Sequence, residues 1–208
     1  MEAKKIILVS HDIEKVGSFI IKNPIISVGF FIGDDKGNQL HTHRFNISVK
    51  WPIFDIETKS ICDYGDFEPR CWNEFWKTLD PEIKNKCLID TNPPAQAWKD
   101  ISDMLDNLEI LYPESDFIIK FLTDNASFDT ASIDYALEKY ANRAPMRYSS
   151  TGKYRSVISA DDMFEMLPPN LYSIENSHIN SIVKHDHDPV NDAHYIYLQY
   201  IAAKHIKI

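Results

Sequence analysis

The sequence has few cysteines and no long apolar run, and both shortages narrow the class of protein. Cys62, Cys71 and Cys87 form no CxxC pair and no even set, so we expect neither a disulfide framework nor a zinc site. No stretch approaches the roughly 20 apolar residues of a membrane-spanning helix. The apolar run near Met1 is too short for a signal peptide. The sequence therefore predicts a soluble, cytoplasmic protein without a membrane partner.

Positive charge is also in short supply. Lysine and arginine number 22 against 31 aspartates and glutamates, which gives a formal net charge of −9. A protein that coats nucleic acid non-specifically needs a broadly basic surface, so this class is excluded. An enzyme that grips only a few nucleotides remains compatible with the acidic balance, because a metal-dependent site is itself a cluster of negative charge.

The order of apolar segments predicts a mixed α/β fold. Residues 6–9 form a short apolar run typical of a buried strand, and residues 25–32 and 39–47 flank a turn-forming cluster typical of a hairpin. Gly29, inside the second strand, indicates a close backbone approach. Further segments predict a strand at 117–122 and helices over 70–79, 95–111, 128–140, 160–167 and 189–204.

Two aspartate–proline pairs predict helix starts. Asp80 precedes Pro81 and Asp188 precedes Pro189. Aspartate is favoured as an N-cap and proline in the first helical turn. No repeat, low-complexity tract or linker interrupts these elements, so we expect a single domain over residues 1–208.

Four acidic residues and one histidine stand far apart in the chain but in contexts that suit divalent cations. Asp12 and Glu14 lie two positions apart after the first apolar run, so on a strand their side chains project to the same side. Asp129 follows the strand at 117–122, and His187 precedes Asp192 by five positions. Mg²⁺ and Mn²⁺ prefer carboxylate oxygens, and a histidine can accept a proton from an attacking water near neutral pH.

These residues form three motifs that resemble those of the DEDDh 3′–5′ exonucleases. They are Asp12-Ile-Glu14, Asn125-x-x-Phe128-Asp129 and His187-x4-Asp192, in the order found in that family. The resemblance spans residues 5–203. It implies an α/β, ribonuclease H-like fold, in which a mixed β-sheet is flanked by helices.

The resemblance also implies a role for each residue. In that family the first aspartate bridges two Mg²⁺ or Mn²⁺ ions, which is the role implied for Asp12. Glu14 and Asp192 would complete one cation site, and Asp129 would hold the second ion. Two such ions, about 3.5–4 Å apart, activate water and stabilise the departing 3′ oxygen. His187 would be the general base.

Other histidines and a second acidic pair compete for these roles. His185 and His194 are alternatives to His187, although a helical His194 would point about 160° away from Asp192. The segment Phe54-Asp55-Ile-Glu57-Thr58 matches the first motif of the family better, letter for letter, than the segment that contains Asp12 and Glu14 does. We favour Asp12 and Glu14 because the hairpin expected after the first motif follows them.

Four residues are candidates for substrate binding. Asn125 and Phe128 resemble family residues that border the substrate, and Lys15 replaces the small or hydroxylated residue often found after the glutamate. Arg155 belongs to a stretch without any acidic residue, which predicts a track for the nucleic-acid backbone. The other basic residues of this stretch are Lys139, Arg143, Arg147 and Lys153, and its candidates for base stacking are Tyr148 and Tyr154.

The predicted function is a metal-dependent 3′–5′ exonuclease that acts on single-stranded 3′ ends, with RNA slightly favoured over DNA. Trp72 and Trp76, with Tyr154-Arg155, are similar to the branch that contains polyadenylate-specific RNase AS and phage DexA-type exonucleases. Two alternatives stay open. One is a catalytically silent module of the same fold that binds nucleic acid or protein, and the other is a structure-selective nuclease or a phosphodiesterase on short oligonucleotides. The resemblance also predicts a homodimer.

Overall fold

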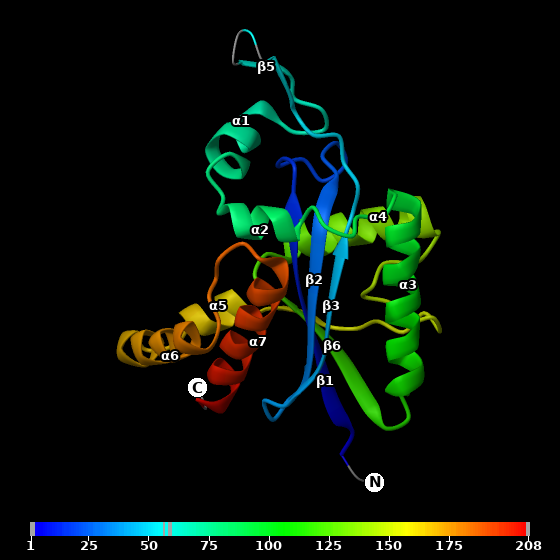
Figure 1. Cartoon of the computed structure of the whole chain (residues 1–208). Coiled ribbons are helices and arrows are strands. Elements are labelled where there is room, and N and C mark those ends of the chain that lie inside the picture. Colours follow the sequence, from blue (N-terminus) through cyan, green and yellow to red (C-terminus); the bar gives the residue numbers. More distant parts are fainter. Residues whose placement is uncertain (1–2, 56, 58–59, 207–208) are drawn as a thin grey trace.

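A five-stranded mixed sheet lies at the centre of the computed structural model, which describes residues 3–55, 57 and 60–206. In spatial order its strands are β3 (Gln39–Asn46), β2 (Ile25–Asp34), β1 (Lys5–Lys15), β6 (Phe117–Thr123) and β7 (Val157–Ser159). β1 pairs antiparallel with β2 and parallel with β6, so the central strand joins the hairpin half of the sheet to its parallel half (Figure 1).

Helices cover both faces of this sheet. Alternate residues of β1 divide between the two layers, as the two-residue period of a strand requires. Ile7 and Val9 join the core cluster of Trp98, whereas Leu8 joins that of Tyr197. The first face carries α3 (Pro94–Leu111) and α4 (Ala131–Ala141), and the second carries α5 (Ala160–Glu165), α6 (Pro169–Ile182) and α7 (Pro189–His205). None of the helices within the described residues has the length and apolarity to cross a membrane.

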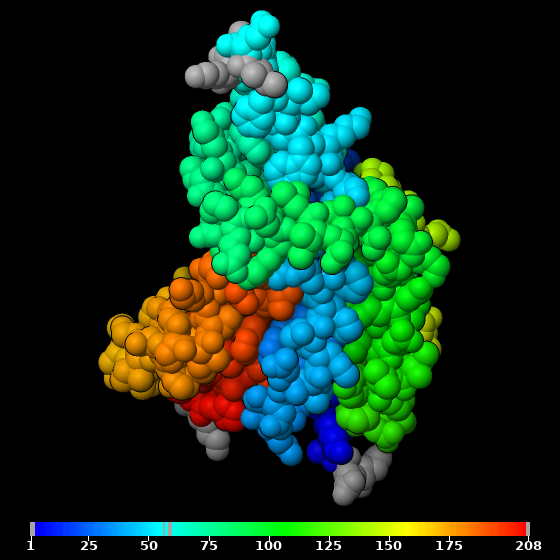
Figure 2. All heavy atoms as spheres, viewed as in Figure 1, coloured from blue at the N-terminus to red at the C-terminus, as the bar shows by residue number. Residues whose placement is uncertain are grey.

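A small aromatic unit extends beyond one end of the sheet (Figures 1 and 2). It contains β4 (Ile53–Asp55), β5 (Ser60–Asp63), α1 (Pro69–Cys71), the π-helical turn η1 (Trp72–Trp76) and α2 (Pro81–Lys86). Trp72 and Trp76 are buried there against Phe67. The Trp76 indole donates a hydrogen bond to the carbonyl of Lys15 (2.8 Å), which ties the unit to the end of β1.

Most predicted elements are confirmed, but two predicted helices differ in type, and β4, β5, β7 and α6 were not predicted. The hairpin, the strand at 117–122, and the helices at α3 and α7 are present, and Asp80 and Asp188 cap helices by accepting from Glu82 N and Val190 N. The segment expected as one helix over 70–79 starts as α1 and continues as the π-helical turn η1. The segment expected as one helix over 128–140 starts in a second π-helical turn, η2 (Ala126–Thr130), and continues as α4. We did not predict α6 from the sequence, although its apolar residues are nearly as periodic as those of α4; of its residues, Ile179 is fully buried.

Gly29 of β2 sits where α7 approaches the sheet most closely. It pairs with Asp12 of β1 on one side and with Arg44 of β3 on the other. A Cβ atom at this position would lie 2.1 Å from the carbonyl oxygen of Pro189. The close backbone approach predicted at Gly29 is therefore confirmed, and it is what allows the N-terminal end of α7 to reach Asp12.

Replacing Gly29 with alanine is expected to lower the free energy of unfolding by about 1–3 kcal/mol, the usual cost of overpacking. The methyl group would meet main-chain atoms of Pro189, so relief requires a shift of α7. Thermal unfolding monitored by circular dichroism measures the effect. Gly37→Asn is the control, because no atom lies within 4 Å of a Cβ there and asparagine tolerates positive φ. Equal melting temperatures for Gly29→Ala and the parent protein would contradict the argument.

Candidate active site

The four acidic residues selected from the sequence meet at one end of the sheet. β1 supplies Asp12 and Glu14, η2 supplies Asp129, and the first turn of α7 supplies Asp192. All four side chains are buried, yet they line one open cleft of about 490 Å³. Segments far apart in the chain therefore converge on a single acidic surface.

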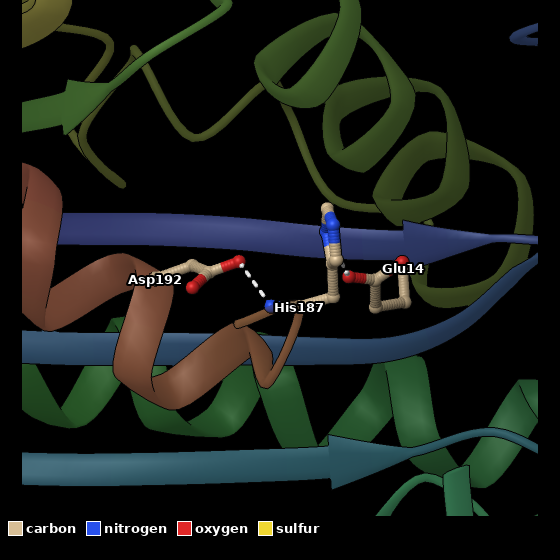
Figure 3. Close-up of side chains that lie close together, drawn as sticks. All are labelled: Glu14, His187 and Asp192. Carbon is tan, nitrogen blue, oxygen red and sulfur yellow. Dashed lines mark hydrogen bonds and ion pairs between the residues drawn. The ribbon is translucent and has the colours of Figure 1, made fainter. Parts of the chain in front are cut away.

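The potential metal ligands fall into two neighbouring groups. Carboxylate oxygens of Asp12, Asp124 and Asp129 lie within 4.8 Å of one another. Ligand atoms of Glu14, His187 and Asp192 form a second group under the same limit (Figure 3). Such sets of oxygen atoms, with one imidazole, suit Mg²⁺ or Mn²⁺, which prefer hard anionic ligands.

The electrostatics of the cleft favour bound cations. Burial raises the pKa of Asp129 and of Asp192 to about 8. Burial also raises the pKa of Asp12 well above its ordinary value, and repulsion from Glu14 and Asp192 adds to this rise. Without positive charge the carboxylates repel one another, whereas a divalent cation reverses that balance.

His187 is positioned beside the second group. Its backbone takes a left-handed conformation (φ 67°), and its N–H donates to Asp192 Oδ2 (3.1 Å). The imidazole Nδ1 lies 3.9 Å from Glu14 Oε1, and the ring meets Phe75 edge-on at 4.9 Å between centroids. Burial and the neighbouring His185 lower the pKa of His187, so the ring is neutral near pH 7 and able to accept a proton.

The two competing histidines occupy different places. His185 also lines the cleft, with Nε2 3.5 Å from Asp192 Oδ2 and its ring stacked on Tyr195. His194 stacks against Phe31, with 4.1 Å between ring centroids. It does not line the cleft in the part of the chain that the structure describes. His185 is therefore the rival to His187 that the geometry retains.

The structure divides the four predicted substrate-binding residues. Lys15, Asn125 and Phe128 line the cleft. Arg155 does not, which corrects the expectation of a substrate contact: its side chain is buried and its Nη2 lies 3.0 Å from Glu109 Oε1.

The predicted basic track needs the same correction, because its arginines already have partners. Arg143 pairs with Asp106 at 2.9 Å, and Arg147 pairs with Asp134 at 2.7 Å. These acids lie on α3 and α4, away from the basic stretch in sequence. Their charges neutralise the arginines, so the stretch offers less positive charge to a nucleic-acid backbone than its composition indicates.

The rival acidic pair lies elsewhere. Asp55 belongs to β4 in the aromatic unit, and Glu57 is exposed; Ile56 and Thr58 of the same segment lie outside the described residues. Of the described members of this segment, none lines the acidic cleft. Figure 1 places β4 and β5 at the far tip of the unit.

Sequence reasoning missed several residues of the cleft. Asp124 joins Asp12 and Asp129, and its signal was available as an acid directly after β6, whose end meets that of its parallel neighbour β1. Arg70 and Phe75 come from α1 and η1. No local pattern marks them, because only the packing of the aromatic unit brings them to the cleft.

Solved structures of exonuclease I share this arrangement of strands and helices. The zinc-bound E. coli exonuclease I–ssDNA complex superposes with a TM-score of 0.61 at 14% identity, over 99% of this chain and 41% of that one. Exonuclease I from Methylocaldum szegediense gives a TM-score of 0.59 at 11% identity, over 97% and 41%. The fold is ribonuclease H-like.

The present chain therefore spans about two fifths of the length of these structural neighbours. A further structure of exonuclease I gives a TM-score of 0.62 at 14% identity, over 98% of this chain and 41% of that one. No protein-family model and no curated protein sequence matches the chain. At these identities the likeness concerns the fold, and the chemistry has to be argued from the cleft itself.

Proposed function

We propose that this protein is a metal-dependent 3′–5′ exonuclease that hydrolyses single-stranded nucleic acid. The observation that carries the proposal is the convergence of four buried carboxylates and His187 in one open cleft. Structures with the same fold include E. coli exonuclease I bound to ssDNA and to a dT13 oligonucleotide. Fold and cleft chemistry thus support the same class of reaction.

Two Mg²⁺ or Mn²⁺ ions would be held by the acidic residues, Asp12 among them. Glu14 and Asp192 would complete one position, and Asp129 the other, where Asp124 lies close enough to assist. Bound cations supply polarisation of the attacking water and stabilisation of the departing 3′ oxygen in an in-line displacement.

The side chains then perform the remaining tasks. His187, whose Nδ1 lies 3.9 Å from Glu14 Oε1, would accept the proton of the attacking water. Arg70, exposed at the cleft edge and 3.8 Å from the exposed carboxylate of Glu74, would turn from this partner to a phosphate of the substrate. The Phe128 ring, partly exposed in the cleft, stacks against the terminal base.

The test is the degradation of 5′-labelled RNA and DNA of matched sequence. Wild-type protein with Mg²⁺ or Mn²⁺ is expected to give a ladder of products that shorten from the 3′ end, and EDTA is expected to abolish the ladder. Intact substrates with either metal would end the exonuclease proposal. If the protein binds oligonucleotides but never cleaves them, the silent binding module replaces it, and cleavage confined to very short oligonucleotides indicates the phosphodiesterase.

The histidine variants give the sharpest prediction within this assay. His187→Ala is expected to lower kcat by about 10²–10⁴-fold, the usual contribution of a general acid–base group. His194→Ala is the matched control and should retain activity, because its ring packs on Phe31 rather than in the cleft. A loss on His185→Ala that equals or exceeds the loss on His187→Ala would transfer the role of base to His185.

Three finer points of the proposal are separable. RNA is proposed as slightly favoured over DNA, and the matched substrates compare the two directly. Membership of the RNase AS or DexA-type branch would show as faster degradation of polyadenylate than of mixed-sequence RNA. The proposed homodimer is tested by light scattering coupled to size exclusion.

A further inference from the structure

A second cavity, of about 210 Å³, lies directly beside the acidic cleft. We call it the lysine pocket, and define it by Lys15, Lys22, Ser132, Tyr135, Lys139 and Tyr140. Lys15 lines both the lysine pocket and the acidic cleft. The two hollows therefore share one wall.

Lys15 is unusual because it is a lysine whose side chain is almost completely buried. It follows Glu14, where the β1–β2 register shifts, and it is only 6% exposed. Its ammonium donates to Ser132 Oγ (3.1 Å) and to the carbonyl of Ile20 (3.3 Å). Among the described residues, no carboxylate oxygen comes within 4.0 Å of this nitrogen. Asp129, which also lines the acidic cleft, attracts this ammonium from beyond that distance, and an anionic ligand would add a closer counter-charge that offsets the cost of burial.

The rest of the lysine pocket has the same character. Lys22 and Lys139 add two exposed cations, whereas Asp66 is the one acid among the described lining residues. The Asp66 carboxylate already accepts the N–H of Lys50 (2.7 Å). The chain as a whole has a net charge of −9. The three lysines of this pocket outnumber its one aspartate, so the pocket is a local positive surface.

Aromatic rings complete the chemistry of a nucleotide site. The Lys139 ammonium lies 4.9 Å from the ring centroid of Tyr140 and 5.5 Å from that of Tyr135. The Lys15 ammonium lies 5.4 Å from the ring centroid of Phe128, which faces the acidic cleft. Cations beside exposed rings are the combination with which proteins bind single strands, because the cations take phosphates and the rings take bases.

We propose that the lysine pocket binds a phosphate and its nucleoside from the substrate strand, upstream of the bond that is cleaved. The proposal rests on the proposed exonuclease function, because Lys15 lines both hollows and so places the pocket next to the acidic cleft. The strand would pass from the metal-binding acids over Phe128 and Lys15 to Lys22 and Lys139. The site thus holds more of the strand than its terminal nucleotide.

The experiment compares binding of labelled oligonucleotides of one to eight nucleotides by fluorescence anisotropy in EDTA, where no cleavage occurs. The variant is Lys22→Gln/Lys139→Gln, which leaves Lys15 and the catalytic groups untouched. The control is Lys36→Gln/Lys99→Gln, which removes two exposed lysines outside both hollows. Thermal unfolding checks that both proteins are folded.

The expected result is a loss of at least tenfold in affinity for the longer oligonucleotides in the pocket variant alone. The slope of log affinity against log salt should also fall by about 0.7, since the pocket holds one phosphate and each phosphate contact on a single strand contributes about 0.7. Affinity and salt slope equal to those of the control variant would overturn the proposal. A nucleoside monophosphate that binds as tightly as the octamer would also overturn it, by assigning the pocket to free nucleotide.

Failure of this inference is separable from failure of the proposed function. The anisotropy measurement needs no catalysis, whereas the ladder assay needs no lysine pocket. A protein that cleaves but shows no effect of the two lysines loses only the upstream subsite. A protein that binds through the lysines but never cleaves keeps the nucleotide site but loses the exonuclease proposal, and with it the position of the site upstream of a cleaved bond.

Discussion

Asp12→Asn is expected to abolish nuclease activity while raising the melting temperature of the metal-free protein. The Asp12 carboxyl is buried, and burial together with Glu14, Asp192 and Asp129 raises its pKa in the folded state. The folded state therefore holds this proton more tightly than the unfolded chain does. Stability of the metal-free protein consequently falls as the pH rises above 3.8, the ordinary pKa of the group. A neutral amide removes that penalty at neutral pH.

Both effects should be large enough to measure. In a protein of this size each kcal/mol shifts the melting temperature by about 2–4 °C, so a gain of several degrees in EDTA is expected. Cation-assisted stabilisation of the transition state supplies several kcal/mol, so its loss should slow cleavage by about 10³-fold or more. Scanning fluorimetry in EDTA and the ladder assay in Mn²⁺ provide the two readouts.

The control for this variant is Glu57→Gln, from the rival acidic pair. Glu57 is exposed and outside the acidic cleft, so neither activity nor stability should change. A variant at Asp12 with full activity would refute the metal-ligand role. If Asp12→Asn melts at a lower temperature than the parent protein in EDTA, the negative charge of Asp12 is compensated in the folded protein.

Arg44→Ala is expected to cause the largest loss of stability. The Arg44 guanidinium pairs with Asp188, whose side chain is 3% exposed, and Lys86 lies 3.4 Å from the same carboxylate. Burial alone would raise the pKa of Asp188, but Arg44 holds it below its ordinary value. Breaking a buried ion pair by removing one partner typically costs about 3–5 kcal/mol, which corresponds to a fall of roughly 10 °C.

Asp188 also caps α7 and adjoins His187, so the same variant should lower kcat. Lys99→Ala is the control, because its pair with Asp103 is exposed and should contribute less than about 1 kcal/mol. The double variant Arg44→Ala/Asp188→Asn should recover part of the loss, since it no longer buries a carboxylate that has lost its closest cation and keeps only Lys86. Equal losses in the single and double variants would contradict this account.

The elements with regular periodicity were predictable from the sequence. The β2–β3 hairpin and α3 follow from alternation and from an apolar stripe, which depend on neighbours along the chain. The convergence of Asp12, Glu14, Asp129 and Asp192 followed from a family resemblance rather than from periodicity. Local patterns alone do not reveal which distant strands become neighbours.

The errors about Arg155 and Asp124 share one physical cause, which is that the partner of a charged side chain depends on which distant segments pack together. Arg155 looked free in a stretch without acids, yet Glu109 of α3 neutralises it in the folded protein. Asp124 was overlooked because its relation to Asp12 depends on the parallel pairing of β1 with β6. Lys15 was expected to contact the substrate, but its link to Ser132 and to a second cavity becomes visible only when α4 packs beside β1.

The position of α7 has a consequence for the time at which the protein becomes active. This helix carries Asp192, follows His187 and packs against β1 and β2. A ribosome delivers the chain from its N-terminus, so Asp12, Glu14 and Asp129 emerge well before that helix exists. If the cleft cleaves as proposed, a growing chain lacks both the last acid and the base, so cleavage begins only after this helix has docked.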